Sequence, residues 1–356
     1  MNTQQTPPPS GLASPSCSPS FSPHGVDLFG EPIRPANQSP VAQKFLVPPF
    51  STLNSREGEW QDRKRAWKEL GIESEIGRGF VRPHGKDTRP VGYAWEDEYT
   101  GGDCWRGGKS GDTAASIFDP VLCEIAYRWF TTEGMQVVDP FAGGSVRGIV
   151  AASMGRKYWG SELREEQVEA NREQAAKICP ANPPQYVCGD SMDTMEHAPD
   201  ADFIFSCPPY GDLEKYSDDP KDLSAMEWHT FAAAYKRIIL RACKRLKEDR
   251  FACFVVGDFR CPKGFYRNFV SETINGFEAC GVRLYNEAIL ITSVGSACMR
   301  VTKQFEAGRK FAKTHQNVLV FCKGDWKRAT RAISPENVPA LAQSGGEKTT
   351  TEESNL

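Results

Sequence analysis

The sequence contains no apolar run of about 18 residues, which excludes a transmembrane helix of ordinary length. Its N-terminal region has no apolar segment of the kind that a secretory signal requires, so a cytoplasmic location is predicted. The 12 cysteines include no Cys-x-x-Cys pair and the five histidines do not cluster with them, so we predict no metal site. The formal net charge of −3 excludes a globally basic protein but allows a local basic surface.

Composition divides the chain into four parts. Residues 1–44 are rich in Pro, Ser and Gln and lack hydrophobic periodicity, so a disordered tail is predicted. Residues 326–356 are interpreted as a polar C-terminal tail. Residues 45–115 are expected to form an extension that packs on the core. A helix predicted at 56–72 in this extension carries two tryptophans at helical spacing, which indicates that they pack in the core more than that they contact DNA. Residues 116–325 form the main domain.

Strands and helices alternate along the main domain. This alternation predicts an α/β fold, in which a parallel sheet is covered by helices on both faces. No helix is expected between the last two strands, so one of them is predicted to be antiparallel. The pattern predicts strands at 136–142, 157–163, 185–189, 202–207, 251–257, 284–292 and 317–322, and helices at 118–132, 146–154, 164–178, 227–247 and 266–280.

The segment VVDPFAGGSVRG, residues 137–148, runs from a strand through an acid and a glycine-rich turn into a helix. Glycines let the backbone approach a ligand closely, and a helix N-terminus offers free amides. In an open parallel sheet, nucleotides bind at such a turn. The spacing is not Gly-x-Gly-x-x-Gly, which argues against a dinucleotide cofactor.

Two acids follow the next two strands. Glu162 ends the strand after the glycine turn, where an acid can accept hydrogen bonds from both hydroxyls of a ribose. The alternative is that Glu162 stabilises the N-terminus of the following helix. Asp190 can accept a hydrogen bond from the amino group of an adenine ring or cap a helix, and both roles are compatible.

The most specific motif is FIFSCPPYGD, residues 203–212. Its apolar strand ends in two prolines, which remove two backbone donors and fix an extended backbone. Tyr210 is thereby held at the carboxyl end of the sheet. A rigid aromatic face suits stacking on a planar base that has left a helix. The alternative is a structural corner with Tyr210 packed inward.

The order of these pieces resembles the S-adenosylmethionine-dependent DNA amino-methyltransferases, in the gamma arrangement and in the form often carried by bacteriophages and prophages. The closing segment RKFAKTHQNVLVFCKG resembles the H-x-x-L-V-F-x-K strand of these enzymes. The resemblance implies a class I, Rossmann-like methyltransferase fold with seven strands, one of them antiparallel. It implies methyl transfer to the exocyclic amino group of adenine or cytosine in DNA, in a bacterial or phage-infected cell.

The resemblance also implies the site residues. The cofactor-binding positions that it marks are Phe118, Asp139, Phe141, Gly143, Gly144, Ser145, Glu162, Asp190 and Ser191. The catalytic positions are Cys207, Pro208, Pro209 and Tyr210, with Tyr210 stacking on the target base.

Two features depart from the family pattern. Gly144 and Ser145 displace the second glycine of the turn. Cys207 precedes the prolines, where the family has Asp, Asn or Ser as an acceptor for the target amine, and a thiol is a poor acceptor. The carbonyl of Pro208 remains as an acceptor, so we interpret Cys207 first as a near-isostere of Ser.

Three alternatives stay open. A Cys207 thiolate would attack carbon 6 of a pyrimidine and activate carbon 5, although the carbon-5 enzymes carry this cysteine after a proline. In the second alternative, the substrate is RNA or a small molecule and not DNA. In the third alternative, the chain has a degenerate methylase fold that binds DNA but catalyses no reaction.

A basic segment, residues 293–315, separates the last two strands. Its only acid is Glu306, so it can neutralise phosphates although the net charge of the chain is close to zero. The alternative is a solvated surface. The predicted DNA contacts are Arg300, Lys303, Arg309, Lys310 and Lys313.

Overall fold

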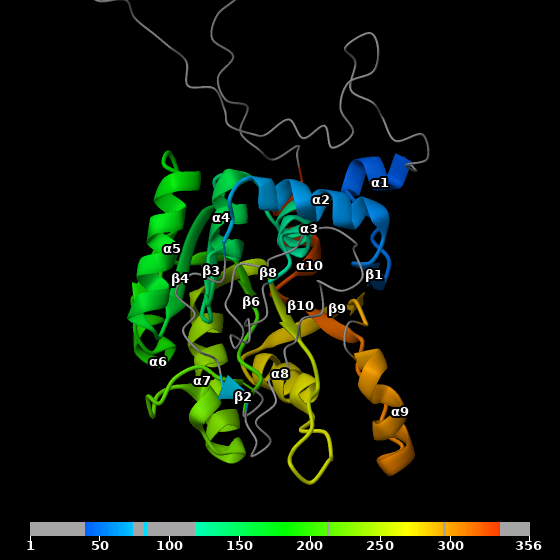
Figure 1. Ribbon diagram of the computed structural model, residues 1–356. Helices are drawn as coiled ribbons and strands as arrows, with labels where there is room; N and C mark the ends of the chain where they lie inside the picture. The colour runs from blue at the N-terminus through cyan, green and yellow to red at the C-terminus, as the bar shows by residue number, and fades with distance from the viewer. Residues whose placement is uncertain (1–39, 74–81, 84–117, 212–213, 295–296, 335–356) are drawn as a thin grey trace, which may run out of the picture.

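The computed structural model describes residues 40–73, 82–83, 118–211, 214–294 and 297–334 (Figure 1). Much of the predicted N-terminal extension and most of the two predicted tails lie outside these ranges.

One sheet dominates the described part of the chain. Its eight strands are β1 (Thr52–Asn54), β3 (Gln136–Asp139), β4 (Lys157–Glu162), β5 (Gln185–Cys188), β6 (Ala201–Ser206), β8 (Leu246–Val256), β9 (Val282–Ile291) and β10 (His315–Lys323). They lie in the order β1-β9-β10-β8-β6-β3-β4-β5. β10 is antiparallel to both of its neighbours, whereas the other neighbouring pairs are parallel. The predicted class I, Rossmann-like α/β fold is therefore confirmed, with β1 as an additional strand.

Helices cover both faces of the sheet, because successive strand residues point to opposite sides. Val137 and Phe203 belong to one buried cluster, which they share with α3 (Pro120–Phe130), α4 (Val146–Ser153) and α5 (Glu165–Ile178). Their neighbours Val138 and Ile204 belong to the other, which they share with α7 (Trp228–Arg245) and α8 (Phe269–Glu278). The near-continuous apolar strands of the sequence are thus buried on both sides.

The helix α2 (Gly58–Glu69) lies across α3 (Figure 1). Trp60 and Trp67 are buried, and their indole nitrogens donate to Asp119 at 3.1 Å and to Glu124 at 2.8 Å. Burial raises the pKa of Glu124, but hydrogen bonds from Arg63 and Trp67 outweigh it and hold the pKa below its ordinary value. Both tryptophans therefore belong to the core, as the sequence analysis favoured.

Several elements were not predicted from the sequence. The expectation that no helix separates the last two strands was wrong, because the helix α9 (Ala297–Gly308) occupies the middle of the basic segment and extends away from the sheet (Figure 1). Helices α1 (Pro40–Phe45) and α10 (Trp326–Ala332) lie partly or wholly in the segments assigned to tails. A short antiparallel pair joins β2 (Arg82–Pro83) to β7 (Glu214–Lys215).

Local contacts explain the two terminal helices. Asp325 caps α10 by accepting a hydrogen bond from the amide of Arg328 at 2.9 Å, and Ala329 is buried against the core. The indole of Trp129 donates to the carbonyl of Phe45 at 2.9 Å and thereby holds the end of α1. Segments 40–44 and 326–332 are therefore ordered helices and not tails.

We expect Gly148→Ala to lower the free energy of unfolding by about 1–3 kcal/mol, as overpacking does in a close-packed interior. An added Cβ on α4 would overlap the hydroxyl of Tyr186 and lie 2.9 Å from its Cζ. Tyr186 is buried and its hydroxyl donates to the carbonyl of Ser145, so it has little room to move. Urea denaturation measures the difference.

The matched control is Gly58→Ala at the start of α2, where an added Cβ meets no atom within 4 Å. Since alanine is the better helix former, this variant is expected to be neutral or slightly stabilised. Equal stability of the two variants would contradict the packing argument for Gly148.

Candidate functional site

The predicted site residues lie at the carboxyl ends of parallel strands, which meet at one edge of the sheet. β3 leads into the turn 140–145, β4 ends at Glu162, β5 leads to Asp190, and β6 leads to Cys207. The parallel sheet therefore brings four segments that are distant in sequence to a common edge.

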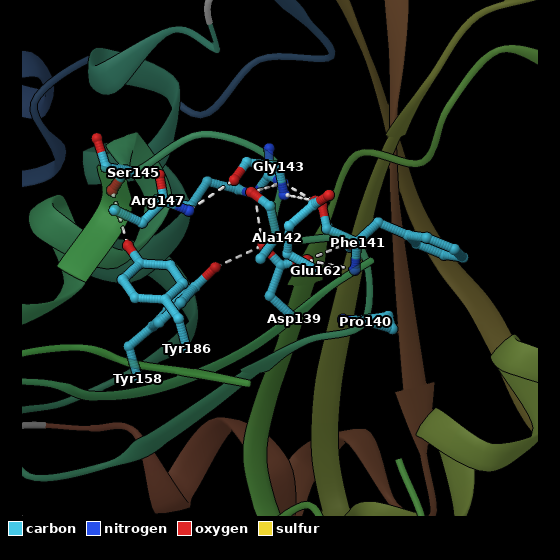
Figure 2. A network of polar contacts seen from close by, with 12 residues as sticks. Asp139, Pro140, Phe141, Ala142, Gly143, Ser145, Arg147, Tyr158, Glu162 and Tyr186 are labelled. Carbon is cyan, nitrogen blue, oxygen red and sulfur yellow. Dashed lines mark hydrogen bonds and ion pairs between the residues drawn. The ribbon is translucent and has the colours of Figure 1, made fainter. Parts of the chain in front are cut away.

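Asp139, the last residue of β3, is fully buried and accepts four hydrogen bonds (Figure 2). Its Oδ2 accepts from Nε of Arg147 at 2.6 Å and from the hydroxyl of Tyr158 at 2.8 Å. Its Oδ1 accepts from the amide of Phe141 at 3.0 Å and from Oγ of Ser206 at 2.5 Å. These donors come from α4, β4, the turn and the end of β6. One carboxylate therefore ties together four segments of the site.

Arg147 clamps the turn after β3 from inside the protein. Its Nη2 donates to the carbonyls of Phe141 and Ala142 at 2.5 and 2.9 Å, and its guanidinium lies 4.7 Å from the ring centroid of Phe118. Burial lowers the pKa of Arg147, but the charge of Asp139 outweighs this effect and holds the pKa above its ordinary value. Arg147 therefore stays charged and neutralises Asp139.

Gly143 and Glu162 face each other across the turn (Figure 2). The amide of Gly143 donates to Oε2 of Glu162 at 3.0 Å, and the amide of Arg164 donates to Oε1 of Glu162 at 3.0 Å. Gly143 has φ +51°, a conformation that L side chains rarely adopt, so a glycine is suited to this position. Two predicted cofactor residues are thus in direct contact at the edge of the sheet.

The side chains of two further predicted residues hold the turn in place. Ser145 Oγ donates to Oε1 of Gln174 at 3.1 Å, and Ser191 Oγ donates to the carbonyl of Pro140 at 2.5 Å. Gly144 and Ser145 are both buried. The two residues that displace the second glycine of the family pattern are therefore buried within the folded turn.

Asp190 caps the short helix α6 (Ser191–Thr194), because its Oδ1 accepts from the amide of Met192 at 2.8 Å. This confirms the capping role, and the adenine-binding role stays a prediction. The ring of Phe141 packs 5.8 Å from Tyr235 and 6.4 Å from Phe254 and so belongs to the edge of the second cluster.

Tyr210 is held at its hydroxyl by two partners. The Nε2 atom of Gln316, on β10, donates to this hydroxyl at 2.8 Å. The side chain of Cys207 is hydrogen-bonded to the same hydroxyl. Burial and Cys207 both raise the pKa of Tyr210 well above its ordinary value, so the hydroxyl stays protonated.

The ring of Tyr210 is also fixed by its neighbours. It meets Phe259 and Phe269 in edge-on contacts, with centroids 6.2 and 6.0 Å apart. The preceding Pro208 is buried, whereas Pro209 and Tyr210 are partly exposed. The tyrosine is therefore positioned by surrounding side chains as well as by the prolines that precede it.

The basic segment lies at the same edge of the sheet, since α9 follows the carboxyl end of β9. Lys303, Arg309 and Lys310 are exposed, and Lys313 is half-buried. Lys313 and Tyr210 lie on either side of the same point at Gly257, because a Cβ added there would be 3.6 Å from both Cε of Lys313 and Cε1 of Tyr210. The basic segment is therefore close to Tyr210. Arg300 lies in α9.

Three residues that shape the site were not assigned a role from the sequence. Arg147 stands within the glycine-turn motif, Ser206 precedes the Cys-Pro-Pro-Tyr motif, and Gln316 stands within the closing strand motif. Each lies inside a segment that the sequence marked as important. Their partners lie on other strands, and a local pattern carries no information about those pairings.

The described residues offer neither a metal site nor a membrane span. No group of three or more His, Cys, Asp or Glu side chains in this part of the chain is arranged to hold a metal ion. No helix among the same residues is long and apolar enough to cross a membrane.

No protein-family model and no curated protein matches this sequence. Solved structures resemble it at low identity. TrmN from Thermus thermophilus is 16% identical with a TM-score of 0.40, over 58% of this chain and 49% of TrmN, so the chain matches about half of that protein's length. A putative RNA methyltransferase from Pyrococcus horikoshii is 15% identical with a TM-score of 0.38, over 58% of this chain and 82% of that one.

A third structure, the [4+2]-cyclase SpnF, is 13% identical with a TM-score of 0.41, over 62% of this chain and 86% of that one. The names of these proteins cover different reactions. A shared fold therefore does not identify the reaction of this chain, which depends on the residues of its own site.

Proposed function

We propose that this protein transfers a methyl group from S-adenosylmethionine to the exocyclic amino group of adenine or cytosine in DNA. The observation that carries the proposal is the contact between its two key motifs. Ser206, at the start of the Cys-Pro-Pro-Tyr segment, donates to Asp139, at the start of the glycine turn. A cofactor held by the turn and a base held by Tyr210 would therefore lie next to each other.

The residues at the turn fit the proposed cofactor. Glu162 ends β4 with an acceptor carboxylate, which suits the two hydroxyls of a ribose. Gly143 offers a backbone without a Cβ in the turn before α4, which suits the methionine portion. Asp190 would accept from the adenine amino group while capping α6. S-adenosylmethionine, when bound, supplies an electrophilic methyl group.

Asp139 acts indirectly in this proposal. The donors Arg147, Tyr158, Ser206 and the Phe141 amide surround its carboxylate, which is fully buried. Asp139 and Arg147 would fix the shape of the turn, while Gly143 and Glu162 would contact the cofactor.

The other half of the site fits a planar amino-bearing base. Tyr210 would stack on the base, and the carbonyls of Cys207 and Pro208 would accept from its amino group. This leaves the nitrogen lone pair directed at the methyl group. Catalysis would then rest on positioning, which requires a rigidly held Tyr210. The hydrogen bonds from Gln316 and to Cys207 supply that rigidity.

The test combines cofactor binding with product analysis. Isothermal titration calorimetry of the full chain should detect S-adenosylmethionine binding, and Glu162→Gln should weaken it about 10- to 150-fold, the range for a hydrogen bond to a charged group. The matched control is Glu166→Gln, an exposed acid at the start of α5. Equal affinity of both variants would contradict the ribose role of Glu162.

Nucleoside mass spectrometry of DNA from cells that express the protein identifies the product. An amino-methylated adenine or cytosine, retained in Cys207→Ser, is the expected result. A carbon-5 product that disappears with Cys207→Ser would make Cys207 a nucleophile. Modified RNA without modified DNA would change the substrate. The absence of any modified base, despite cofactor binding, would reject the nucleic-acid methylation proposal.

A further inference from the structure

Two segments at the carboxyl edge are rich in Lys and Arg. They are the loop 258–268, between β8 and α8, and the segment 297–315, which contains α9. Together they hold eight Lys and Arg against two acids, Asp258 and Glu306, in a chain whose net charge is −3. The loop was not among the predicted DNA contacts.

The two segments touch each other. An added Cβ at Gly264, in the loop, would lie 2.8 Å from Nζ of Lys310, which follows α9. The loop also reaches the proposed target site, because Phe259 at its start packs edge-on against Tyr210. At the other segment, Lys313 lies near Tyr210 across Gly257. Both segments therefore lie close to Tyr210 and to each other.

The tip of the loop is a rigid support for an exposed aromatic ring. The amide of Cys261 donates to the carbonyl of Phe265 at 2.8 Å, and the guanidinium of Arg260 lies 4.0 Å from the ring centroid of Tyr266 while donating to the carbonyl of Gly264. Phe265 is nevertheless 74% exposed. A single exposed ring is common on protein surfaces, so its significance depends on the charged and aromatic side chains around it.

The second segment displays aromatic rings in the same way. Phe311 is 75% exposed and stacks on Phe305 at a centroid distance of 5.9 Å, and the guanidinium of Arg309 lies 5.2 Å from the centroid of Phe305. Every residue from 301 to 311 is exposed. Exposed aromatic rings interleaved with cations suit a ligand that offers both phosphates and flat bases.

We propose that the loop 260–266 and the segment 301–313 form one nucleic-acid-binding surface, in which cations hold the phosphates while Phe265 and Phe311 stack on bases that have lost their neighbours. This inference rests on the proposed function for the place of the target base at Tyr210. The inference adds the loop 260–266 to the predicted nucleic-acid contacts. It also specifies that the bases of the bound nucleic acid are locally unstacked. When a base leaves a helix, the faces of the bases that stacked on it become exposed. Phe265 and Phe311 would cover these faces.

The test measures binding of the full chain to fluorescein-labelled DNA by fluorescence anisotropy over a range of salt concentrations. The probes are a matched duplex and the same duplex with one mismatched pair, in which unstacking costs less. The wild type should prefer the mismatched duplex. Phe265→Ala and Phe311→Ala should each weaken that binding about 5- to 150-fold, the range for removal of one base–aromatic stack. Both variants should keep the salt dependence of the wild type.

Two controls separate stacking from charge. Phe50→Ala removes an equally exposed ring, 71% accessible, that precedes β1, and it should leave binding unchanged. Lys263→Ala combined with Lys310→Ala should weaken binding to both duplexes. Each phosphate that is no longer neutralised should reduce the salt slope by about 1.

Each outcome bears on this inference separately from the methyl-transfer proposal. Wild-type affinity in Phe265→Ala and Phe311→Ala, with weakened binding in the lysine variant, would overturn the stacking role. If the wild type bound neither duplex, the surface would serve another partner and the inference would fail, even if the protein methylated some other acceptor. If binding depended on both rings but S-adenosylmethionine did not bind, the surface would stand and the methyl-transfer proposal would fall.

Discussion

Asp139→Ala is expected to lower the free energy of unfolding by about 3–5 kcal/mol, the typical result of removing one partner from a buried ion pair. The substitution leaves the charge of Arg147 buried without its counter-ion and removes the acceptor for Tyr158 and Ser206. Because Arg147 also holds the carbonyls of Phe141 and Ala142, the glycine turn should loosen with it. Urea denaturation followed by circular dichroism measures the stability change.

A surface ion pair provides the control for this prediction. Asp62 pairs with Arg65 on the exposed side of α2, and Asp62→Ala should cost at most about 1 kcal/mol. Removing both buried partners, as Asp139→Leu with Arg147→Met, should cost less than Asp139→Ala alone, because no charge is left unpaired. If Asp139→Ala were as stable as Asp62→Ala, the four hydrogen bonds of Asp139 would not hold the site together.

Tyr210→Ala is expected to reduce kcat/KM for methyl transfer about 100-fold, because the substitution removes both the stacking face and the alignment of the base. Gln316→Leu removes the hydrogen bond to Tyr210, whereas Tyr210→Phe removes both this bond and the one to Cys207. Gln316→Leu should therefore reduce activity by about 2- to 12-fold, the range for one ordinary hydrogen bond, and Tyr210→Phe by at least as much. Single-turnover assays with a radiolabelled methyl donor measure the rates.

The double variant decides whether the two residues act together. If Gln316 acts only through Tyr210, then Tyr210→Phe combined with Gln316→Leu should be no slower than Tyr210→Phe alone. Asn317→Leu, which alters the next side chain of β10 and its exposed contact with Glu287, should leave the rate unchanged. Multiplicative effects in the double variant would show that Gln316 acts independently of Tyr210.

Local patterns were sufficient to predict the sheet and most of its helices. The strands of the core are apolar runs such as FIFS and FACFVV, and the acids and glycines at their ends mark the edge of the sheet that holds the candidate site. Glu162 and Gly143, two of the residues predicted to bind the cofactor, are in contact at this edge. A parallel sheet converts the linear order of the motifs into proximity, and that explains the success.

The pairings within the site could not be predicted from local patterns. The bond between Ser206 and Asp139 depends on β6 lying next to β3, and the bond between Gln316 and Tyr210 joins residues that are 106 positions apart. The helix α9 was missed for a different reason. Its lysines and arginines indicated a charged connection between two strands, although Ala297, Val301 and Phe305 recur at helical spacing. The role of Cys207 was equally hidden, because its contact with Tyr210 requires the folded turn.

The position of β10 in the sheet has a consequence for biosynthesis. This strand is the last of the described strands to leave the ribosome, yet it lies between β8 and β9, and β1 reaches the rest of the sheet only through β9. Until residues 315–323 are available, the nascent chain holds β8 and β9 with unpaired edges, which are prone to aggregation. Gln316 belongs to the same late strand. Tyr210 therefore gains its hydrogen bond from Gln316 only after translation has passed β10.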